Sequence, residues 1–207
     1  MNDKPTNSKI NIRFVPIGYF PFDFNISRIE KWKSCLFKVH KHEITNPLRT
    51  LHQKDGSTYN DSMLLEDISD ISKTITPEEQ RSFIFVLTNS PVEEGWYSRI
   101  LAPNAVVMSF SNVRNYLIKE HIPLENAVIS LFYMYSLLYK KDSRIPEREV
   151  EEAFLHMDTR ACIFDMTPSN ADIVYCSAGV GICYECSKKL NILGKDLINK
   201  EPIRNFV

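Results

Sequence analysis

Apolar residues of this chain gather in a few short runs that polar stretches separate. Three runs have the length and composition of strands, at residues 11–18, 83–88 and 105–110. The last two are apolar almost without interruption, which is typical of strands covered on both faces. Residues 36–44 instead alternate between apolar and polar, which predicts a strand with one exposed face.

The longest apolar stretch predicts a buried helix over residues 123–139, because its apolar positions continue nearly all round the helix. Shorter helices are expected at residues 27–35, where Ser27 and Glu30 have the spacing of a capping box, and at residues 63–74. Thr76-Pro77-Glu78-Glu79 has the features of another helix start. Residues 46–62 are expected to form a loop, and residues 140–148, which are charged, a linker.

This order of elements, β-α-β-α-β-β-α followed by a cysteine-rich end, predicts one α/β domain. We expect a mixed sheet packed with helices, a long buried central helix and a small C-terminal lobe stapled by zinc. Residues 1–148 would form the α/β core, and residues 149–207 a metal-binding segment of the same domain. With 207 residues, 43% of them hydrophobic, the chain can bury a core of this size.

Composition and charge exclude several classes of function. A formal net charge of −1 argues against a general nucleic-acid binder. No apolar run is long enough to cross a membrane, and the polar residues 1–8 lack the core of a signal peptide, so a cytoplasmic protein is expected. Neither glycine-rich nucleotide-binding motif, GxGxxG or GxxxxGK[ST], is present.

Four of the five cysteines follow residue 160, which in a reducing compartment favours a metal site over disulfides. Cys183 and Cys186 form a CxxC pair that can hold one side of a zinc ion, and tetrahedral coordination needs two more ligands. His156 and Cys162 complete one set, and Cys176 is the alternative to His156. One structural Zn²⁺ per chain is therefore expected. The competing interpretation is a group of ordinary buried thiols.

Further candidates surround this site. Residues 156–160, with Asp165 nearby, are dense in functional side chains that suit anion binding or acid–base chemistry. The alternative is local: Asp158 and Thr159 cap a turn, and Arg160 pairs with Asp158 or Asp165. His40 and His42 lie on one strand face and could chelate a metal, although such a face is more often merely solvated.

Residues 89–99 are expected to connect two buried strands, and they contain Trp96, Tyr97 and Arg99. These residue types are enriched where proteins bind one another, so they are candidates for contact with a protein or peptide partner. The alternative is that Trp96 and Tyr97 fold back onto the core.

Taken in order, residues 14–18, 83–110 and 162–190 resemble archaemetzincins, a family of zinc proteases. Residues 14–18 are similar to the family's first strand, and the later order of strand, loop and strand also matches. The end of the chain carries the more specific resemblance, through Cys162-Ile163-Phe164, Asp172 and residues 181–190. In the family, a cysteine precedes the Met-turn and a CxxC closes a structural zinc site. The resemblance thus implies a metzincin-like core with a structural zinc.

The chain departs from the family at the catalytic motif. Archaemetzincins carry HExxHxxGxxH on the central helix, whereas the matching residues 125–133 contain no histidine, and Phe164 stands where the methionine is expected, with Met166 close by. The resemblance therefore implies a non-catalytic pseudo-metalloprotease that holds a protein or peptide along the former cleft. The alternative is a zinc-dependent hydrolase in which His156 and two cysteines hold the metal and Asp158 or Asp165 is the general base.

Overall fold

The centre of the molecule is a five-stranded mixed sheet. The computed structural model describes residues 9–18, 20–41, 58–62, 64–66, 82–145, 154–179 and 181–190. The strand order is β2-β1-β3-β5-β4, and β4 alone runs antiparallel to its neighbour. The strands are β1 (Ile10–Ile17), β2 (Phe37–Lys41), β3 (Ser82–Thr88), β4 (Ser98–Ala102) and β5 (Ala105–Ser109). The expected α/β class and mixed sheet are confirmed.

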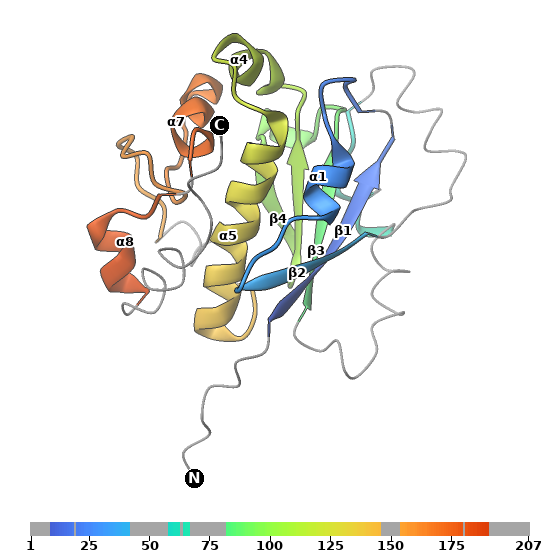
Figure 1. Cartoon of the computed structure of the whole chain (residues 1–207). Coiled ribbons are helices and arrows are strands. Elements are labelled where there is room, and N and C mark those ends of the chain that lie inside the picture. Colours follow the sequence, from blue (N-terminus) through green and yellow to red (C-terminus); the bar gives the residue numbers. More distant parts are fainter. Residues whose placement is uncertain are drawn as a thin grey trace.

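One long helix separates the sheet from the described residues between 154 and 190. Helix α5 covers one face of the sheet, and the stretch that carries α7 and α8 lies on its far side (Figure 1). The helices with described bounds are α1 (Ile26–Glu30), α4 (Arg114–Lys119), α5 (Leu124–Asp142), α7 (Ile173–Ser177) and α8 (Tyr184–Lys189), with short 3₁₀ turns η2 (Glu93–Gly95) and η3 (Asn170–Asp172). All residues of α5 from Leu124 to Tyr139 are buried, so the prediction of a buried central helix is confirmed.

The core has two parts, one on each face of the sheet. Along β3, Phe83 and Phe85 belong to the cluster beneath α5, whereas Ile84 and Val86 belong to the cluster on the opposite face. This alternation explains why β3 is apolar throughout, since both of its faces are buried.

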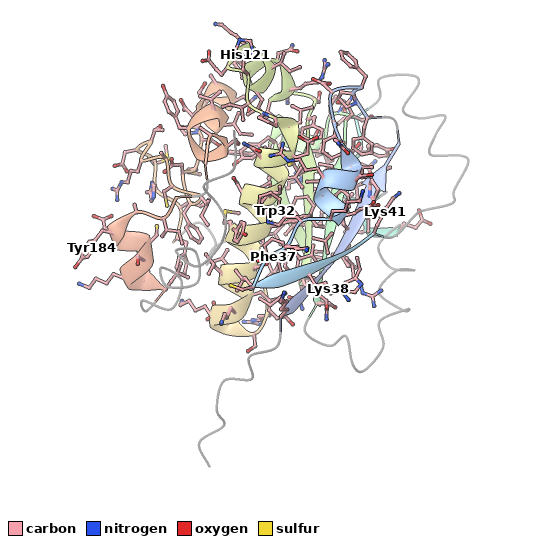
Figure 2. The ribbon with its side chains drawn as sticks, in the orientation of Figure 1. Trp32, Phe37, Lys38, Lys41, His121 and Tyr184 are labelled. Atoms are coloured by element: carbon pink, nitrogen blue, oxygen red, sulfur yellow. The ribbon has the colours of Figure 1, made fainter. Side chains whose placement is uncertain are left out.

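An aromatic contact joins α5 to the sheet. The ring of Phe132 lies 5.9 Å from Phe14, 5.7 Å from Phe37 and 4.8 Å from Phe85, each close to perpendicular. Edge-to-face contacts of this kind are favourable for aromatic rings. The Phe37 ring also packs at 5.0 Å on Tyr133, whose hydroxyl accepts a hydrogen bond from Trp32 Nε1 at 3.3 Å. Figure 2 labels Trp32 and Phe37 close to α5. The residues around the start of β2 are thereby fixed against α5.

Helix α1 differs from its prediction. A helix is present where one is expected, but it begins after Asn25 and ends at Glu30, so its predicted end at residue 35 and its capping box are wrong. The side chain of Asn25 caps the helix by accepting the backbone N–H of Arg28 at 3.3 Å. The backbone N–H of Asn25 donates to the buried carboxylate of Glu125 in α5. In a capping box this N–H donates to a glutamate three residues further along the same helix, so Glu125 replaces that glutamate here.

Two elements between β3 and α5 were missing from the prediction. The last residues of the expected connection 89–99 belong to β4, which forms a tight hairpin with β5 through Asn104 at φ 58°. All five residues of β4 are half-buried, so the strand lacks an alternating pattern that the sequence could reveal. Helix α4 is short and follows β5 directly.

The expected linker over 140–148 begins too early. Helix α5 continues through Lys140 and Lys141 to Asp142 and ends at Ser143, which has the left-handed φ of 58°. Basic side chains suit the last turn of a helix, since they oppose its negative end.

Other predictions fall partly or wholly outside the described residues. Residues 61–62 and 64–66 are helical, so the expected loop ends earlier and the next helix starts earlier than predicted. Residues 67–74, the predicted helix start at 76–79 and the expected boundary near 148 lie outside the described part. Within that part, none of the helices combines the length and the apolar character that a membrane crossing requires.

Candidate metal centre

The candidate ligands lie in the C-terminal segment, a name used here for the described residues from 154 to 190. A backbone bridge closes the first loop of this segment: the N–H of His156 donates to Phe164 O at 3.1 Å, and the N–H of Met166 donates to His156 O at 3.0 Å. The N–H of Ile163 donates to Gly181 O at 2.9 Å and brings the CxxC stretch alongside this loop. Two parts of the sequence therefore meet at one place.

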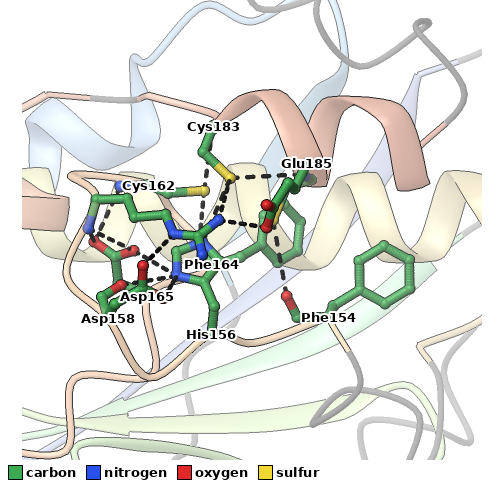
Figure 3. A network of polar contacts seen from close by, with 10 residues as sticks. Phe154, His156, Asp158, Cys162, Phe164, Asp165, Cys183 and Glu185 are labelled. Carbon is green, nitrogen blue, oxygen red and sulfur yellow. Dashed lines mark hydrogen bonds and ion pairs between the residues drawn. The ribbon is translucent and has the colours of Figure 1, made fainter.

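Four side chains converge where these two parts meet. One ligand atom from each of His156, Cys162, Cys183 and Cys186 lies within 4.8 Å of the others, and together they could hold a metal ion. Cys162 and Cys186 are buried, while His156 and Cys183 are half-buried. His156 Nε2 lies 3.6 Å from Cys183 Sγ (Figure 3). These are the four residues that the sequence predicts as ligands.

Backbone N–H groups point at two of the sulfur atoms. Cys162 Sγ accepts from the N–H of Phe164 at 3.5 Å and from the N–H of Cys183 at 3.4 Å. Cys183 is the N-cap of α8, and its Sγ accepts from the N–H of Cys186 at 3.5 Å. Such bonds favour the thiolate form, which is the form that binds a metal.

The pKa shifts of the cluster residues agree with these hydrogen bonds. A hydrogen bond from the thiol of Cys186 lowers the pKa of Cys162 below its ordinary value, and the same bond raises the pKa of Cys186. Burial alone would lower the pKa of His156, but its hydrogen bonds to Cys162 and to the backbone of Asp158 outweigh burial and raise that pKa. Cys162 thus loses its proton before Cys186 does.

An exposed group of charges lies over the cluster. Arg160 Nε donates to Asp158 Oδ2 at 2.6 Å, and its Nη1 donates to Glu185. The same Nη1 lies 3.9 Å from Cys183 Sγ. The guanidinium lowers the pKa values of both carboxyls, and those carboxylates raise the pKa of Arg160. The expected local pairing of Arg160 with Asp158 is therefore present, and Glu185 is an additional partner.

Cys176 does not join the cluster. It lies in α7, where its thiol donates to Ile173 O at 3.4 Å, and burial raises its pKa to about 12.

Of the two histidines in the expected strand pair, His40 has Nε2 3.2 Å from Asn11 Oδ1, and His42 lies outside the described residues. His121 lies beyond the end of α4, in a turn with φ 56° (Figure 2).

The three candidate partner-binding residues line a pocket with a volume of about 80 Å³. Trp96, Tyr97 and Arg99 form one wall near β4. Helix α5 and the C-terminal segment supply the rest, so that the full lining is Trp96, Tyr97, Ser98, Arg99, Ile100, Leu131, Met134, Tyr135, Leu155, Asp165 and Met166. Tyr97 also packs against the core, so the two interpretations of this residue are compatible.

Arg99 is held by three carboxylates beside this pocket. It pairs with Asp61, and it lies 3.6 Å from Glu93 and 3.6 Å from Glu94. Its side chain is only 11% exposed, whereas those of Glu93 and Glu94 are 50% and 55% exposed. The group of side chains around Arg99 therefore carries more negative than positive charge.

Sequence reasoning did not find that Leu155, Asp165 and Met166 line the same pocket as Trp96. No local pattern could have shown this, because the pocket forms only when the C-terminal segment packs on α5.

No family model, curated protein or solved structure matches this chain. The interpretation of the site therefore depends on its own geometry and chemistry.

Proposed function

We propose that His156, Cys162, Cys183 and Cys186 bind one structural zinc ion. The observation that carries the proposal is the convergence of four ligand atoms within 4.8 Å. Zinc binds sulfur at about 2.3 Å and nitrogen at about 2.0–2.1 Å, so neighbouring ligands of a tetrahedral site are roughly 3.5 Å apart. The 3.6 Å between His156 Nε2 and Cys183 Sγ already has this spacing.

The ligand types favour zinc over other metals. Three thiolates with one imidazole suit zinc, whereas carboxylate and carbonyl oxygens suit magnesium and calcium. The ion would join the loop around Cys162 to the start of α8. Its binding energy would thus become folding energy for the C-terminal segment.

The same geometry supports a non-catalytic role. A catalytic zinc keeps one position open for water, but four protein ligands close the site. The hydrolase alternative needs one of the three cysteines outside the coordination sphere, although all three lie within the cluster. The two candidate bases are also engaged, Asp158 by Arg160 and Asp165 by backbone N–H groups.

Helix α5 gives further support, since it contains no histidine in the turns where archaemetzincins hold their catalytic zinc. We therefore propose a pseudo-metalloprotease, related to that family, that binds a protein or peptide partner. The features that support the proposed relationship to archaemetzincins are the C-terminal residues and the order of the elements.

The pocket beside β4 is the place for such a partner. In the described part of the chain, β4 is the last strand of the sheet, so an extended peptide can pair along its outer edge. The apolar and aromatic lining fits one large apolar side chain of that peptide. Around Arg99, three carboxylates face one guanidinium, which favours a basic residue next to the apolar one.

Metal content and thermal stability test the zinc proposal. We expect one zinc per purified chain, slow removal by a chelator, and a lower melting temperature once zinc is gone. Zinc that leaves without a change in melting temperature would indicate an open site and would redirect attention to hydrolysis. A chain without any metal would overturn the proposal.

Selection from a library of random peptides tests the partner proposal. With the zinc-loaded chain as bait, we expect peptides that share a large apolar residue beside a lysine or arginine. Trp96→Ala should weaken their binding at least about tenfold, as for a central contact of an interface. Tyr175→Ala, which removes an aromatic side chain exposed on α7, should leave binding unchanged. Equal binding by both variants, or no enriched peptide, would contradict the assignment.

A further inference from the structure

Asp165 is a buried carboxylate beside the cluster. Its residue is 3% exposed, and its oxygens accept from the backbone N–H of Arg160 at 3.1 and 3.2 Å and of Cys162 at 3.0 Å. Its third neighbour is His156, whose Nδ1 lies 3.1 Å from Asp165 Oδ1 (Figure 3). A charge buried this deeply is tolerated only when donors surround it.

The two ring nitrogens of His156 face different surroundings. Nε2 lies on the side of the sulfur atoms, 3.6 Å from Cys183 Sγ. Nδ1 lies on the opposite side, within hydrogen-bond distance of Asp165 Oδ1 and of Asp158 O at 3.0 Å. Both of these neighbours are acceptors, so Nδ1 must carry a proton to bond either one. Nε2 of the neutral ring is then free of hydrogen and can bind a metal.

We propose that Asp165 is a positioning residue for the metal site, one that fixes the tautomer and the orientation of the His156 ring. The inference depends on the proposed zinc site and adds a residue to it that is not a ligand. Carboxylates that accept the second ring N–H of a metal-bound histidine strengthen metal binding, and their loss typically weakens it 10–100-fold.

A matched pair of variants tests this role. Asp165→Asn preserves the size of the side chain but removes the charge and places an amide where two acceptor oxygens are needed. We expect zinc affinity, measured by competition with a chelator, to fall about 10–100-fold. Asp158→Asn is the control, because this neighbouring carboxylate is 63% exposed and its Oδ1 lies 3.9 Å from Nδ1. The control should change zinc affinity by less than about threefold.

Asp165 also holds the backbone of Arg160 and Cys162, so a loss of affinity could reflect the loop alone. A double-mutant cycle with His156→Cys separates the two effects. A cysteine ligand has no ring N–H to orient, so Asp165→Asn should have little effect on affinity in the His156→Cys background. A loss of equal size in both backgrounds would show a purely structural role and would overturn the proposal.

The wild-type chain provides a second measurement in case Asp165→Asn fails to fold. Proton–nitrogen NMR of the zinc-loaded chain should show His156 bound through Nε2, with a slowly exchanging proton on Nδ1. Binding through Nδ1, or fast exchange of that proton, would overturn the proposal even if zinc is present. A wild-type chain without zinc would instead refute the proposed site itself, so the two failures are distinguishable.

Discussion

The backbone N–H of Cys183 donates to Cys162 Sγ across 3.4 Å and thereby joins residues that are 21 positions apart. Because Cys183 also begins α8, this bond fixes the start of the helix against the loop that contains Cys162. The protein's own contacts thus hold the two halves of the cluster in register.

Removal of one sulfur ligand should destabilise the C-terminal segment. We expect Cys183→Ser to bind zinc far more weakly, by more than the 10–100-fold loss typical of residues outside the ligand set, and to melt at a lower temperature. Cys35→Ser is the matched control, since Cys35 is exposed and lies outside the cluster. Calorimetry of both variants provides the measurement, and an unchanged melting temperature in Cys183→Ser would argue against a structural zinc.

Arg160 should slow the loss of zinc. Three thiolates, one neutral imidazole and Zn²⁺ add to a net charge of −1, and the guanidinium lies 3.9 Å from Cys183 Sγ. We expect Arg160→Gln to transfer zinc to a chelator faster, by an amount that shrinks at high salt because the group is exposed. Lys188→Gln removes an equal charge from α8 and serves as the control. Identical transfer rates for both variants would show that Arg160 has no such effect.

The five cysteines should differ in their reaction with an alkylating agent. Cys35 should react first because it is exposed, and the three cluster cysteines should react only after chelation. With its pKa raised to about 12, Cys176 has a thiolate fraction of about one in ten thousand at pH 8, so it should react last. Mass spectrometry of timed samples gives the order. Early modification of Cys176 would mean that α7 opens readily.

The contact of α5 with the sheet should dominate global stability. Phe132→Ala removes a ring that meets Phe14, Phe37 and Phe85, and we expect a loss of about 3–5 kcal/mol in the free energy of unfolding. Tyr175→Ala, at a position 54% exposed, should cost less than about 0.5 kcal/mol. Denaturant titration of both variants measures the difference. Equal losses would contradict the position of Phe132 at the centre of the core.

The sequence predicts a strand or helix correctly where its local apolar pattern indicates how the element is buried. The uninterrupted apolar runs of β3 and α5 show directly that these elements are covered on all sides, and both were predicted correctly. Strand β4 is half-buried throughout and was missed. Helix α1 begins earlier than predicted because Asn25 caps it, and Glu125, distant in sequence, accepts the N–H of that residue.

In the candidate site, too, some features follow from local sequence and others only from the packing of the fold. Metal ligands can be inferred from residue type and spacing, which is why the sequence alone indicates the cysteine pair and His156. Spacing could not decide between His156 and Cys176, since that choice depends on the orientation of α7. The position of Asp165 between the cluster and the pocket was equally hidden, because it arises from packing.

The burial of α5 on both sides affects how much of the protein persists in a cell. The C-terminal segment packs on this helix, where Ser130 Oγ donates to Cys176 O at 3.0 Å, and it lines a pocket together with Leu131 and Met134. The cover of this apolar side would depend on the proposed zinc ion. When zinc is scarce, newly made chains would expose this apolar side to chaperones, proteases and one another. Zinc supply would then set the amount of the protein that persists, and a fall in abundance would be the first sign of deficiency.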